Sequence, residues 1–278
     1  MRFLALAALA SSPLSVYASP INVNLGTAAS FGVLAGSAVT NNGPTVINGN
    51  VGILSGSAIT GFPPGTVTPP STEYFADSVA SQAEADLSTA YNIAAGALCG
   101  TSLTGTDLGG LTLTPGVYCF AASAQLTGTL ILNSQDDPDA IFLFQTGSTL
   151  TTASNSAVDF INDSGGASVY WQVGTSATLG TGTTFEGNIL ADASITLGAG
   201  TTIQCGSALA RSGAVALNSN TVSLETQTCE SGSGTSTPEP ATAFLLLLVG
   251  VPFLLVRRRD RELLSCRRPR AANRQLWS

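Results

Sequence analysis

The sequence repeats itself with a period of about twenty residues. Residues 33–40, Val-Leu-Ala-Gly-Ser-Ala-Val-Thr, return at 53–60 as Ile-Leu-Ser-Gly-Ser-Ala-Ile-Thr, and residues 178–184, Thr-Leu-Gly-Thr-Gly-Thr-Thr, return at 196–202 with one change. Short β-type runs and glycine turns at such a period predict a β-solenoid, in which each coil stacks its apolar residues on the coil below. The leucines expected to stack in the interior are Leu179, Leu197 and Leu217. A β-sandwich is the alternative, because it also has short strands with regular turns.

One segment breaks the repeat. Residues 71–95 predict an α-helix, with Ser71 as its N-cap and Gly96 as its stop. The apolar residues that recur along one side of it are Phe75, Val79, Ala83, Leu87 and Tyr91. Such a helix is about 36 Å long and matches about seven coils of 4.8 Å. We therefore expect it to lie along one face of a body of roughly nine coils.

The basic residues stand almost entirely at the two ends of the chain. The sequence has ten Lys and Arg together, and no His. All ten are arginines; one is Arg2 and eight fall in 257–274, so residues 19–237 keep Arg211 alone. The same residues include fourteen Asp and Glu, so residues 19–237 carry a net charge of −13. A body without Lys and His predicts no nucleic-acid binding and makes most enzyme mechanisms unlikely, since the usual general base and Schiff-base residue are missing.

Both ends have the pattern of processing signals. Residues 1–18 read as a secretory signal peptide, with an N-terminal buried helix as the alternative. A Ser/Gly/Thr-rich linker, 230–237, leads to Pro-Glu-Pro, an apolar run and three arginines within 238–278. This order resembles the PEP-CTERM sorting signal of Gram-negative bacteria, which implies transient membrane contact and removal by an exosortase. The extension 260–278 departs from that pattern, and an ordinary tail anchor is the alternative.

Cysteine use agrees with export. Cys266 lies in the tail, and the body keeps Cys99, Cys119, Cys205 and Cys229, an even number that suits an oxidising compartment. Sequence order favours Cys99–Cys119 and Cys205–Cys229 among the three possible pairings. A zinc site is the competing interpretation, but no Cys-x-x-Cys spacing and no His support it.

Small hydroxyl residues recur after the leucines when Leu150, Leu179, Leu197 and Leu217 are aligned. This alignment predicts rows on one exposed solenoid face that are ordered without a ligand. The candidate residues are Thr152, Ser154, Asn155, Thr181, Thr183, Thr184, Thr201, Thr202, Ser219 and Thr221. Their methyl groups favour ordered water and their hydroxyls anchor it, which is the chemistry needed to hold an ice-like layer. The alternative is that threonine is simply common in exposed strands.

The order of segments across residues 22–224 is similar to the ice-binding (antifreeze) proteins of bacteria, fungi and diatoms. The likeness is carried by 25–60, the helix, Leu-Thr-Leu-Thr-Pro-Gly-Val-Tyr-Cys at 111–119, and the text from 124 to 190. It implies a discontinuous β-solenoid of triangular section, with one helix alongside and the first coils inserted beside later ones. It also implies that ice adsorbs to one flat face. The Thr-(Ala/Gly)-x-(Thr/Asn) pattern of some members occurs in this chain at 152–155 and 181–184.

Other candidate sites are weaker. Asp136, Asp137 and Asp139 could bind Ca²⁺, although acidic residues around a proline usually form a solvated turn. Glu186 and Asp192 could form a glycosidase pair, but nothing in the sequence places them together. Arg211 is expected to pair with a carboxylate or to close a coil end.

The sequence therefore predicts a secreted, monomeric, non-enzymatic protein without a cofactor, whose partner is an ice crystal surface. A matrix or adhesion protein of the cell surface is the first alternative, because an acidic solenoid with an export tail suits a polymer matrix. A solenoid polysaccharide lyase or hydrolase is the second alternative, against which the missing Lys and His argue.

Overall fold

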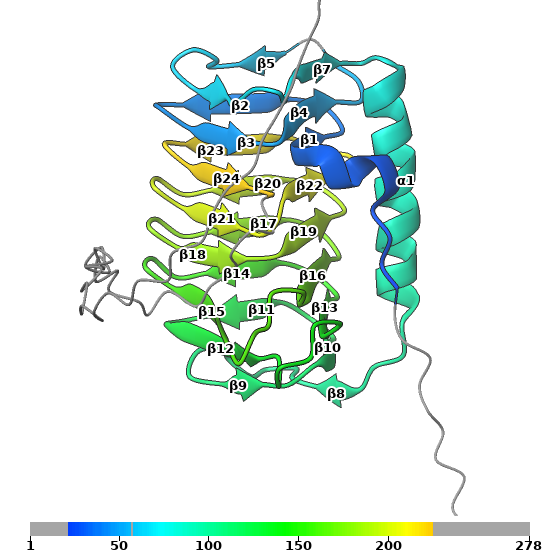
Figure 1. Cartoon of the computed structure of the whole chain (residues 1–278), viewed down its shortest axis with the longest axis vertical. Coiled ribbons are helices and arrows are strands. Elements are labelled where there is room, and N and C mark those ends of the chain that lie inside the picture. Colours follow the sequence, from blue (N-terminus) through cyan, green and yellow to red (C-terminus); the bar gives the residue numbers. More distant parts are fainter. Residues whose placement is uncertain (1–21, 57, 225–278) are drawn as a thin grey trace, which may run out of the picture. The chain divides into compact units, whose positions relative to one another are not determined.

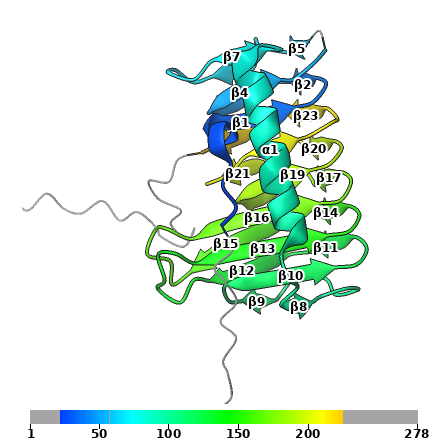
Figure 2. The ribbon, with the colours of Figure 1, turned by 90° about the vertical axis from the view of Figure 1, so that its right-hand side faces the viewer.

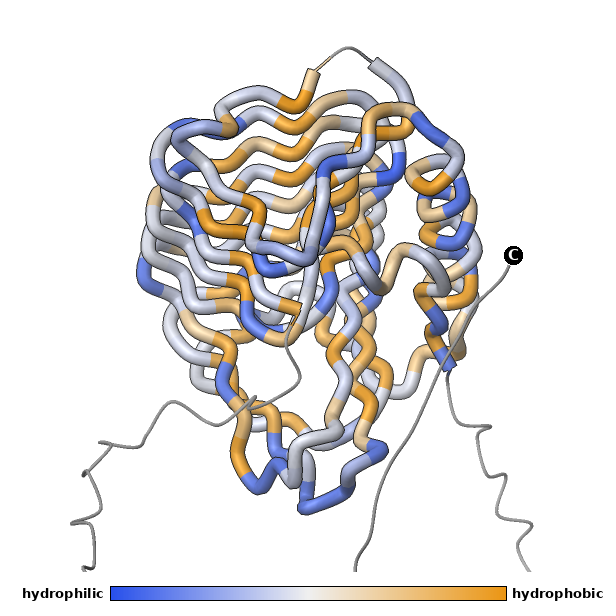
Figure 3. The backbone as a smooth tube through the Cα atoms, turned by 45° about the horizontal axis from the view of Figure 1, so that its top comes forward, coloured by the Kyte–Doolittle hydropathy of each residue, from blue (hydrophilic) through white to orange (hydrophobic). Residues whose placement is uncertain are grey.

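The computed structural model describes residues 22–56 and 58–224. The predicted signal peptide, Cys229, the linker and the sorting signal lie outside these residues. A 3-10 helix, η1 (Gly26–Ser30), leads into three parallel β-sheets, which we call sheets A, B and C. Successive strands along the chain go from sheet A to sheet B to sheet C and back to sheet A, so each coil has three sides (Figures 1 and 3). The predicted β-solenoid is confirmed.

The spatial order of the strands in each sheet differs from their order along the chain. Sheet A contains, from one end to the other, β7 (Glu73–Phe75), β4 (Asn50–Ile53), β1 (Phe31–Ala35), β22 (Ala208–Ala210), β19 (Asn188–Ala191), β16 (Ser168–Val173), β13 (Ile141–Thr146), β10 (Gly116–Phe120) and β8 (Thr101–Ser102). Sheet B contains β11 (Ala124–Leu126), β14 (Leu150–Thr152), β17 (Ala177–Leu179), β20 (Ile195–Leu197), β23 (Val215–Asn218), β2 (Val39–Asn42) and β5 (Ile59–Thr60). Sheet C contains β6 (Thr66–Val67), β3 (Val46–Asn48), β24 (Thr221–Ser223), β21 (Thr202–Gln204), β18 (Thr184–Glu186), β15 (Ala157–Ile161), β12 (Thr129–Asn133) and β9 (Thr112–Leu113).

The solenoid is discontinuous, because its first coils stack on its last. In all three sheets the first strand pairs with the final coil: β1 with β22, β2 with β23, and β3 with β24. The chain then leaves this end after β7 and returns at β8, at the opposite end of the nine-stranded sheet A. The expected insertion of early coils beside late ones is confirmed, and sheet A has the height of the roughly nine predicted coils.

Apolar residues that point inward fill the coils. Leu179, Leu197 and Leu217 are at most 3% exposed and belong to the central cluster, as predicted. At mid-height, the Trp171 ring stacks on Phe144 with centroids 3.9 Å apart, and its Nε1 donates to the Glu186 carbonyl at 3.0 Å. Figure 3 shows hydrophobic residues recurring at matching positions of successive coils. This stacking buries apolar area at every level and is the main stabilising term of the fold.

The single α-helix of the described residues, α1 (Ser78–Gly96), lies along sheet A (Figure 2). The prediction that it begins at Ser71 is wrong. Residues 73–75 pair with β4 as a strand, and the Asp77 carboxylate caps the helix by accepting from the backbone of Val79 and Ala80. Pairing satisfies the backbone groups of this segment, which sequence propensity alone assigned to the helix. The end at Gly96 is confirmed.

The helix buries small residues, which allow close approach to the sheet. Four alanines, Ala80, Ala83, Ala90 and Ala94, are fully buried, and Leu87 lies between them. Two members of the predicted apolar row do not take part, because Phe75 lies on β7 and Val79 faces solvent.

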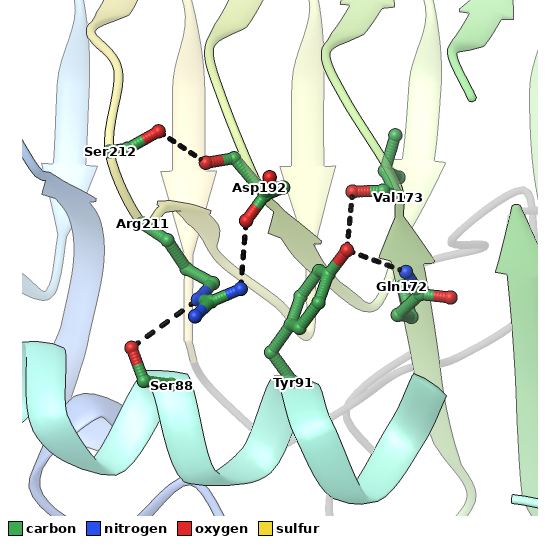
Figure 4. Close-up of polar contacts among 7 residues, drawn as sticks. All are labelled: Ser88, Tyr91, Gln172, Val173, Asp192, Arg211 and Ser212. Atoms are coloured by element: carbon green, nitrogen blue, oxygen red, sulfur yellow. Dashed lines mark hydrogen bonds and ion pairs between the residues drawn. The ribbon is translucent and has the colours of Figure 1, made fainter. Parts of the chain in front are cut away.

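Arg211, the single basic residue of the described chain, joins the helix to the sheet (Figure 4). Its Nη1 donates to the Asp192 carboxylate at 2.7 Å, its Nε to the Ser88 hydroxyl at 3.3 Å, and its guanidinium lies 4.4 Å from the Tyr91 ring centroid. The Tyr91 hydroxyl in turn accepts from Gln172 Nε2. The expectation that Arg211 pairs with a carboxylate is confirmed.

The disulfide Cys99–Cys119 is present, as predicted, and ties the end of α1 to β10. Cys205 is also disulfide-bonded, but its predicted partner Cys229 lies outside the described residues. Within the described part of the chain, no helix is long and apolar enough to cross a membrane.

Two buried glutamates make stability depend on pH. Burial raises the pKa of Glu84, on α1, and of Glu186, on β18, from 4.5 to about 8 in each case. Between these values the folded protein holds protons that the unfolded chain releases, so the free energy of unfolding decreases as pH rises from about 4.5 to 8. We predict that Glu84→Gln flattens this decline, measured as urea midpoints between pH 5 and pH 9, and that adding Glu186→Gln flattens it further. A decline as steep in the double variant as in the unchanged protein would contradict this assignment.

Candidate functional site: the faces of the solenoid

Sheets B and C are the two faces that α1 does not cover. The helix contacts strands of sheet A, and in Figure 2 sheet B lies to one side of it. Any flat surface available for a large partner is therefore on sheet B, on sheet C, or at the corner between them.

Sheet B carries a ladder of small polar side chains that the register places side by side. Each strand contributes its second residue, which faces outward, and neighbouring members are paired across adjacent coils. The ladder runs Gln125, Thr151, Thr178, Thr196, Ala216, Thr40 and Thr60. All five threonines are exposed. Neighbouring rungs of such a ladder are about 4.8 Å apart, so the face presents a regular array of methyl and hydroxyl groups.

A second row of small residues flanks this ladder. The row consists of the residues that precede the strands, and every member except Ser123 accepts a backbone hydrogen bond from a neighbouring coil, which keeps this row in register as well. The row runs Ser123, Thr149, Ser176, Ser194, Ala214, Ala38 and Ala58. The Thr149 hydroxyl donates to the Ser123 hydroxyl at 2.8 Å. The named strands of sheet B contain no charged residue. Beyond Gln125, Asp107 stands at the end of the ladder, where its carboxylate accepts from Thr127 and Gly109.

Sheet C also has a ladder of small residues, but carboxylates lie beside it. Its outward row runs Thr129, Ala157, Thr184, Thr202, Thr221, Val46 and Thr66. Two residues further along the same strands stand Asp159 and Glu186. Burial raises the pKa of Glu186 to about 8, with a further contribution from Asp159 and Asp163. Sheet C therefore differs from sheet B by its acidic side chains.

The ten residues predicted to share one exposed face do not do so. Thr152, Thr183 and Thr201 are at most 3% exposed and point inward, so this part of the prediction is wrong. Three others, Thr184, Thr202 and Thr221, lie on sheet C. The remaining four lie at the exposed corner between sheets B and C: Ser154, Asn155, Thr181 and Ser219.

The misplacement of Thr152 comes from the alignment of the leucines, whereas Thr183 and Thr201 follow the correctly aligned Leu179 and Leu197 and turn inward at the corner. Each sheet B strand has two inward positions with one outward position between them, and Leu150 occupies the first of these. It pairs with Ala177, whereas Leu179 and Leu197 occupy the second. Aligning Leu150 with Leu179 therefore shifts one coil by two residues.

The buried hydroxyls hold the corner between sheets B and C. Each accompanies a turn and donates to a carbonyl one coil away: Ser156 to Leu126 at 3.0 Å, Thr183 to Ala153 at 3.2 Å, and Thr201 to Gly180 at 2.9 Å. Buried carbonyls need such partners, so these residues are part of the fold.

The two motif matches are not equivalent positions. The backbone bond from Asn155 to the Thr181 carbonyl aligns Asn155 with Gly182. Both residues have a left-handed backbone, with φ of 57° and 68°, which asparagine and glycine tolerate best. The Thr-(Ala/Gly)-x-(Thr/Asn) pattern therefore marks this turn in both coils, with its threonine inward in one coil and outward in the other.

Sequence reasoning missed the sheet B ladder. Its signal was present, because Thr178 and Thr196 each stand between two apolar residues, in Ala-Thr-Leu and Ile-Thr-Leu, and Thr40 and Thr60 end the repeated octapeptides. A residue between two inward positions of a strand must point outward.

The weaker candidates do not form sites. Asp137 accepts from the backbone of Asp139 in an exposed turn, and the described residues contain no cluster of acidic, His or Cys side chains that could hold a metal. Glu186 lies on sheet C, whereas Asp192 follows β19 and bonds to Arg211. The two carboxylates therefore do not face one another.

The fold and the open face define a discontinuous β-solenoid with an uncharged, threonine-rich sheet. The chain belongs to the Ice-binding-like family, whose model matches residues 33–223. It is 53% identical over 221 residues to an ice-binding protein of Nostoc sp. (strain HG1), an alignment that covers 79% of this chain and 80% of that one.

Two solved structures are also similar. The crystal structure of an ice-binding protein from the Antarctic ascomycete Antarctomyces psychrotrophicus has a TM-score of 0.68 and 41% identity, covering 73% of this chain and 98% of that one. An ice-binding protein from an Antarctic biological consortium has a TM-score of 0.69 and 42% identity, covering 77% and 96%.

The corner assignment predicts unequal costs for two neighbouring threonines. We expect Thr183→Val to lower the free energy of unfolding by about 1–3 kcal/mol, because it leaves a buried carbonyl without its donor. The matched change Thr181→Val, on the exposed side of the same corner, should stay within about 0.5 kcal/mol. Urea denaturation measures both, and equal costs would contradict the assignment.

Proposed function

We propose that this protein binds ice through sheet B. The observation that carries the proposal is the uncharged ladder of exposed threonines, held in register by the parallel pairing of seven strands. Three similar proteins, from Nostoc sp., an Antarctic ascomycete and an Antarctic consortium, are ice-binding proteins, which supports this function.

The chemistry of the ladder suits water rather than a soluble ligand. Threonine methyl groups leave neighbouring water to bond with other water molecules, while the hydroxyls between them fix some of those molecules in place. Because β-branched threonine has few rotamers, the array is ordered before ice arrives and loses little entropy on binding. Water held in this way merges with the ice lattice.

Adsorption then limits growth of the crystal. The bound protein pins the ice front, which must bulge between neighbouring molecules, so the freezing point falls and recrystallisation slows. No bond is made or broken, and the proposed protein is non-enzymatic and needs no cofactor.

Sheet B suits this role better than sheet C. A carboxylate binds water strongly and must lose that hydration to lie against a lattice that has no countercharge. Asp159 stands on sheet C, whereas the strands of sheet B carry no charged group. We propose that the exposed corner residues Ser154, Asn155 and Thr181 border the ice contact, and that Thr184, Thr202 and Thr221 lie outside its centre.

The proposed setting is extracellular. Export by the N-terminal signal, sorting by an exosortase through the Pro-Glu-Pro tail, and origin in a Gram-negative bacterium are inferred from the sequence pattern alone. The disulfide Cys99–Cys119 supports an oxidising compartment. We propose that the protein is a monomer. We also propose that it binds no nucleic acid, since the described residues include one cation, Arg211, and it is paired with Asp192.

The choice of face is tested by two matched substitutions. Thr178→Tyr places a bulky ring in the middle of the sheet B ladder and is expected to remove most thermal hysteresis and recrystallisation inhibition. Thr202→Tyr makes the same change on sheet C and should keep most of both. Circular dichroism and thermal unfolding check that the two variants are folded.

The outcomes separate the face from the function. If Thr202→Tyr alone loses activity, the ice contact lies on sheet C. If the unchanged protein shows neither thermal hysteresis nor recrystallisation inhibition, the proposed function is wrong.

A further inference from the structure

The row of sheet A residues that faces α1 changes from apolar to polar along the solenoid. Beneath most of the helix it consists of Leu34, Leu209 and Leu190, which are fully buried and paired with one another in that order. The next two coils continue the row with glutamines, because Leu190 pairs with Gln172 and Gln172 pairs with Gln145. Polar amides therefore replace the apolar contact near the C-terminal end of α1.

A groove of about 440 Å³ opens over these two glutamines. It spans the coils of β10, β13 and β16, and the turns that lead from these strands to sheet B form one side of it. Tyr91 and Ala95 of α1 form another side, and Ser102 and Thr104 add hydroxyl groups. The described residues that line the groove include no charged side chain.

Gln172 uses only one half of its amide group, although it is just 6% exposed. Its Nε2 donates to the Tyr91 hydroxyl at 2.9 Å, whereas none of the described residues donates a hydrogen bond to its Oε1. Figure 4 shows this oxygen turned away from Tyr91. A buried amide oxygen without a donor is costly, so it marks a position that a ligand or water must fill.

Gln145 is arranged in the same way. Its Nε2 donates to the carbonyls of Ala94 and Ala97 at the end of α1, at 2.7 and 2.8 Å. Its Oε1 lies 3.2 Å from Cys119 Sγ, but a disulfide sulfur has no proton to donate. The groove therefore contains two amide oxygens that lack a donor, on paired strands about 4.8 Å apart.

The surroundings of these oxygens favour a cation with N–H donors. The negative end of the helix dipole lies here, and the last turn of α1 has no basic residue. Arg211 contacts the Tyr91 ring, but its charge is balanced by Asp192 at 2.7 Å. An apolar molecule has no donor for the two oxygens, and a divalent metal ion is held mainly by carboxylates, which are missing from the described lining.

We infer that this groove binds a primary ammonium group, R–NH₃⁺, between the amide oxygens of Gln145 and Gln172. One ammonium nitrogen donates to two oxygens on adjacent coils, because N–H···O bonds of about 2.9 Å reach both from a position between them. The open side of the groove leaves room for the substituent R. The site lies between sheet A and α1, so it does not depend on the proposed ice contact of sheet B.

Titration with methylammonium chloride tests the site. Nuclear magnetic resonance follows the isotope-labelled full chain in mild detergent, with sodium chloride keeping the ionic strength constant. We expect saturable shifts of the side-chain amide signals of Gln145 and Gln172, with a dissociation constant in the millimolar range, because so small a ligand buries little surface. Tetramethylammonium, which has the charge but no N–H, and potassium should leave both signals in place. Shifts that do not saturate, or an equal response to either control ion, would overturn the inference.

Substitutions at Gln172 separate the acceptor from its surroundings. Gln172→Leu, which copies the leucines of the neighbouring coils, should weaken methylammonium binding by about fivefold or more, because one acceptor is lost. Gln172→Glu should tighten it by about fivefold or more at neutral pH, because a carboxylate makes a stronger, charge-assisted hydrogen bond. The matched control Gln204→Leu, at an exposed position of sheet C, should leave the dissociation constant unchanged.

Two results would contradict the assignment of the oxygens. One is binding to Gln172→Leu as strong as to the unchanged protein, and the other is Gln172→Glu binding no more tightly than the unchanged protein. If Gln172→Leu does not fold, the result with Gln172→Glu decides. Thermal hysteresis of the unchanged protein is a separate measurement, so failure of the ice contact and failure of the ammonium site are distinguishable.

Discussion

The stacking of one coil on the next is the interaction on which every other feature of this protein depends. Parallel hydrogen bonds fix the register of adjacent coils, and the alternation of side chains along each strand then determines which residues are inside and which are outside. Because the period of alternation is two, the same bonds that bury Leu179 and Leu197 place Thr178 and Thr196 outward. The same strand register and alternation therefore determine both the core and the proposed ice contact.

The discontinuity of the fold enlarges that contact. Thr40 and Thr60 come from the first two coils, yet they continue the ladder that Thr151, Thr178 and Thr196 begin. A buried hydrogen bond supports the junction between the first and the last coils. The backbone N–H of Asn220 donates to the Thr45 hydroxyl at 3.0 Å, across 175 positions of sequence. Without this insertion, sheet B would lose the two rungs beyond Ala216.

Much of this architecture could be predicted from the sequence, because the repeat is local information. The period near twenty predicted the coils, and the inward leucines and the end of the helix at Gly96 are confirmed. The start of the helix could not be read, since the pairing of residues 73–75 with β4 joins segments that only the folded coil brings together. The resemblance to a known family, rather than periodicity, was what implied the insertion of the first coils.

The site was harder to predict than the fold for a physical reason. Residue type does not distinguish a threonine that points inward from one that points outward. A shift of two residues also preserves the alternation of apolar residues, although it aligns one coil with the wrong positions of its neighbour. Thr152 reads as a surface residue for this reason. Thr183 and Thr201 do so for another reason, since they lie in turns between strands, where the alternation does not apply, and each donates to a buried carbonyl. For Thr152, the distinction becomes visible when the pairing of Leu150 with Ala177 is known.

The measurement that tests the central claim most directly is partition of the full chain into a hemisphere of ice grown slowly from its solution. If sheet B holds ice-like water, the protein should be incorporated at a higher fraction than an inert soluble protein of similar size mixed into the same solution. Exclusion of both proteins from the ice to the same extent would contradict the account.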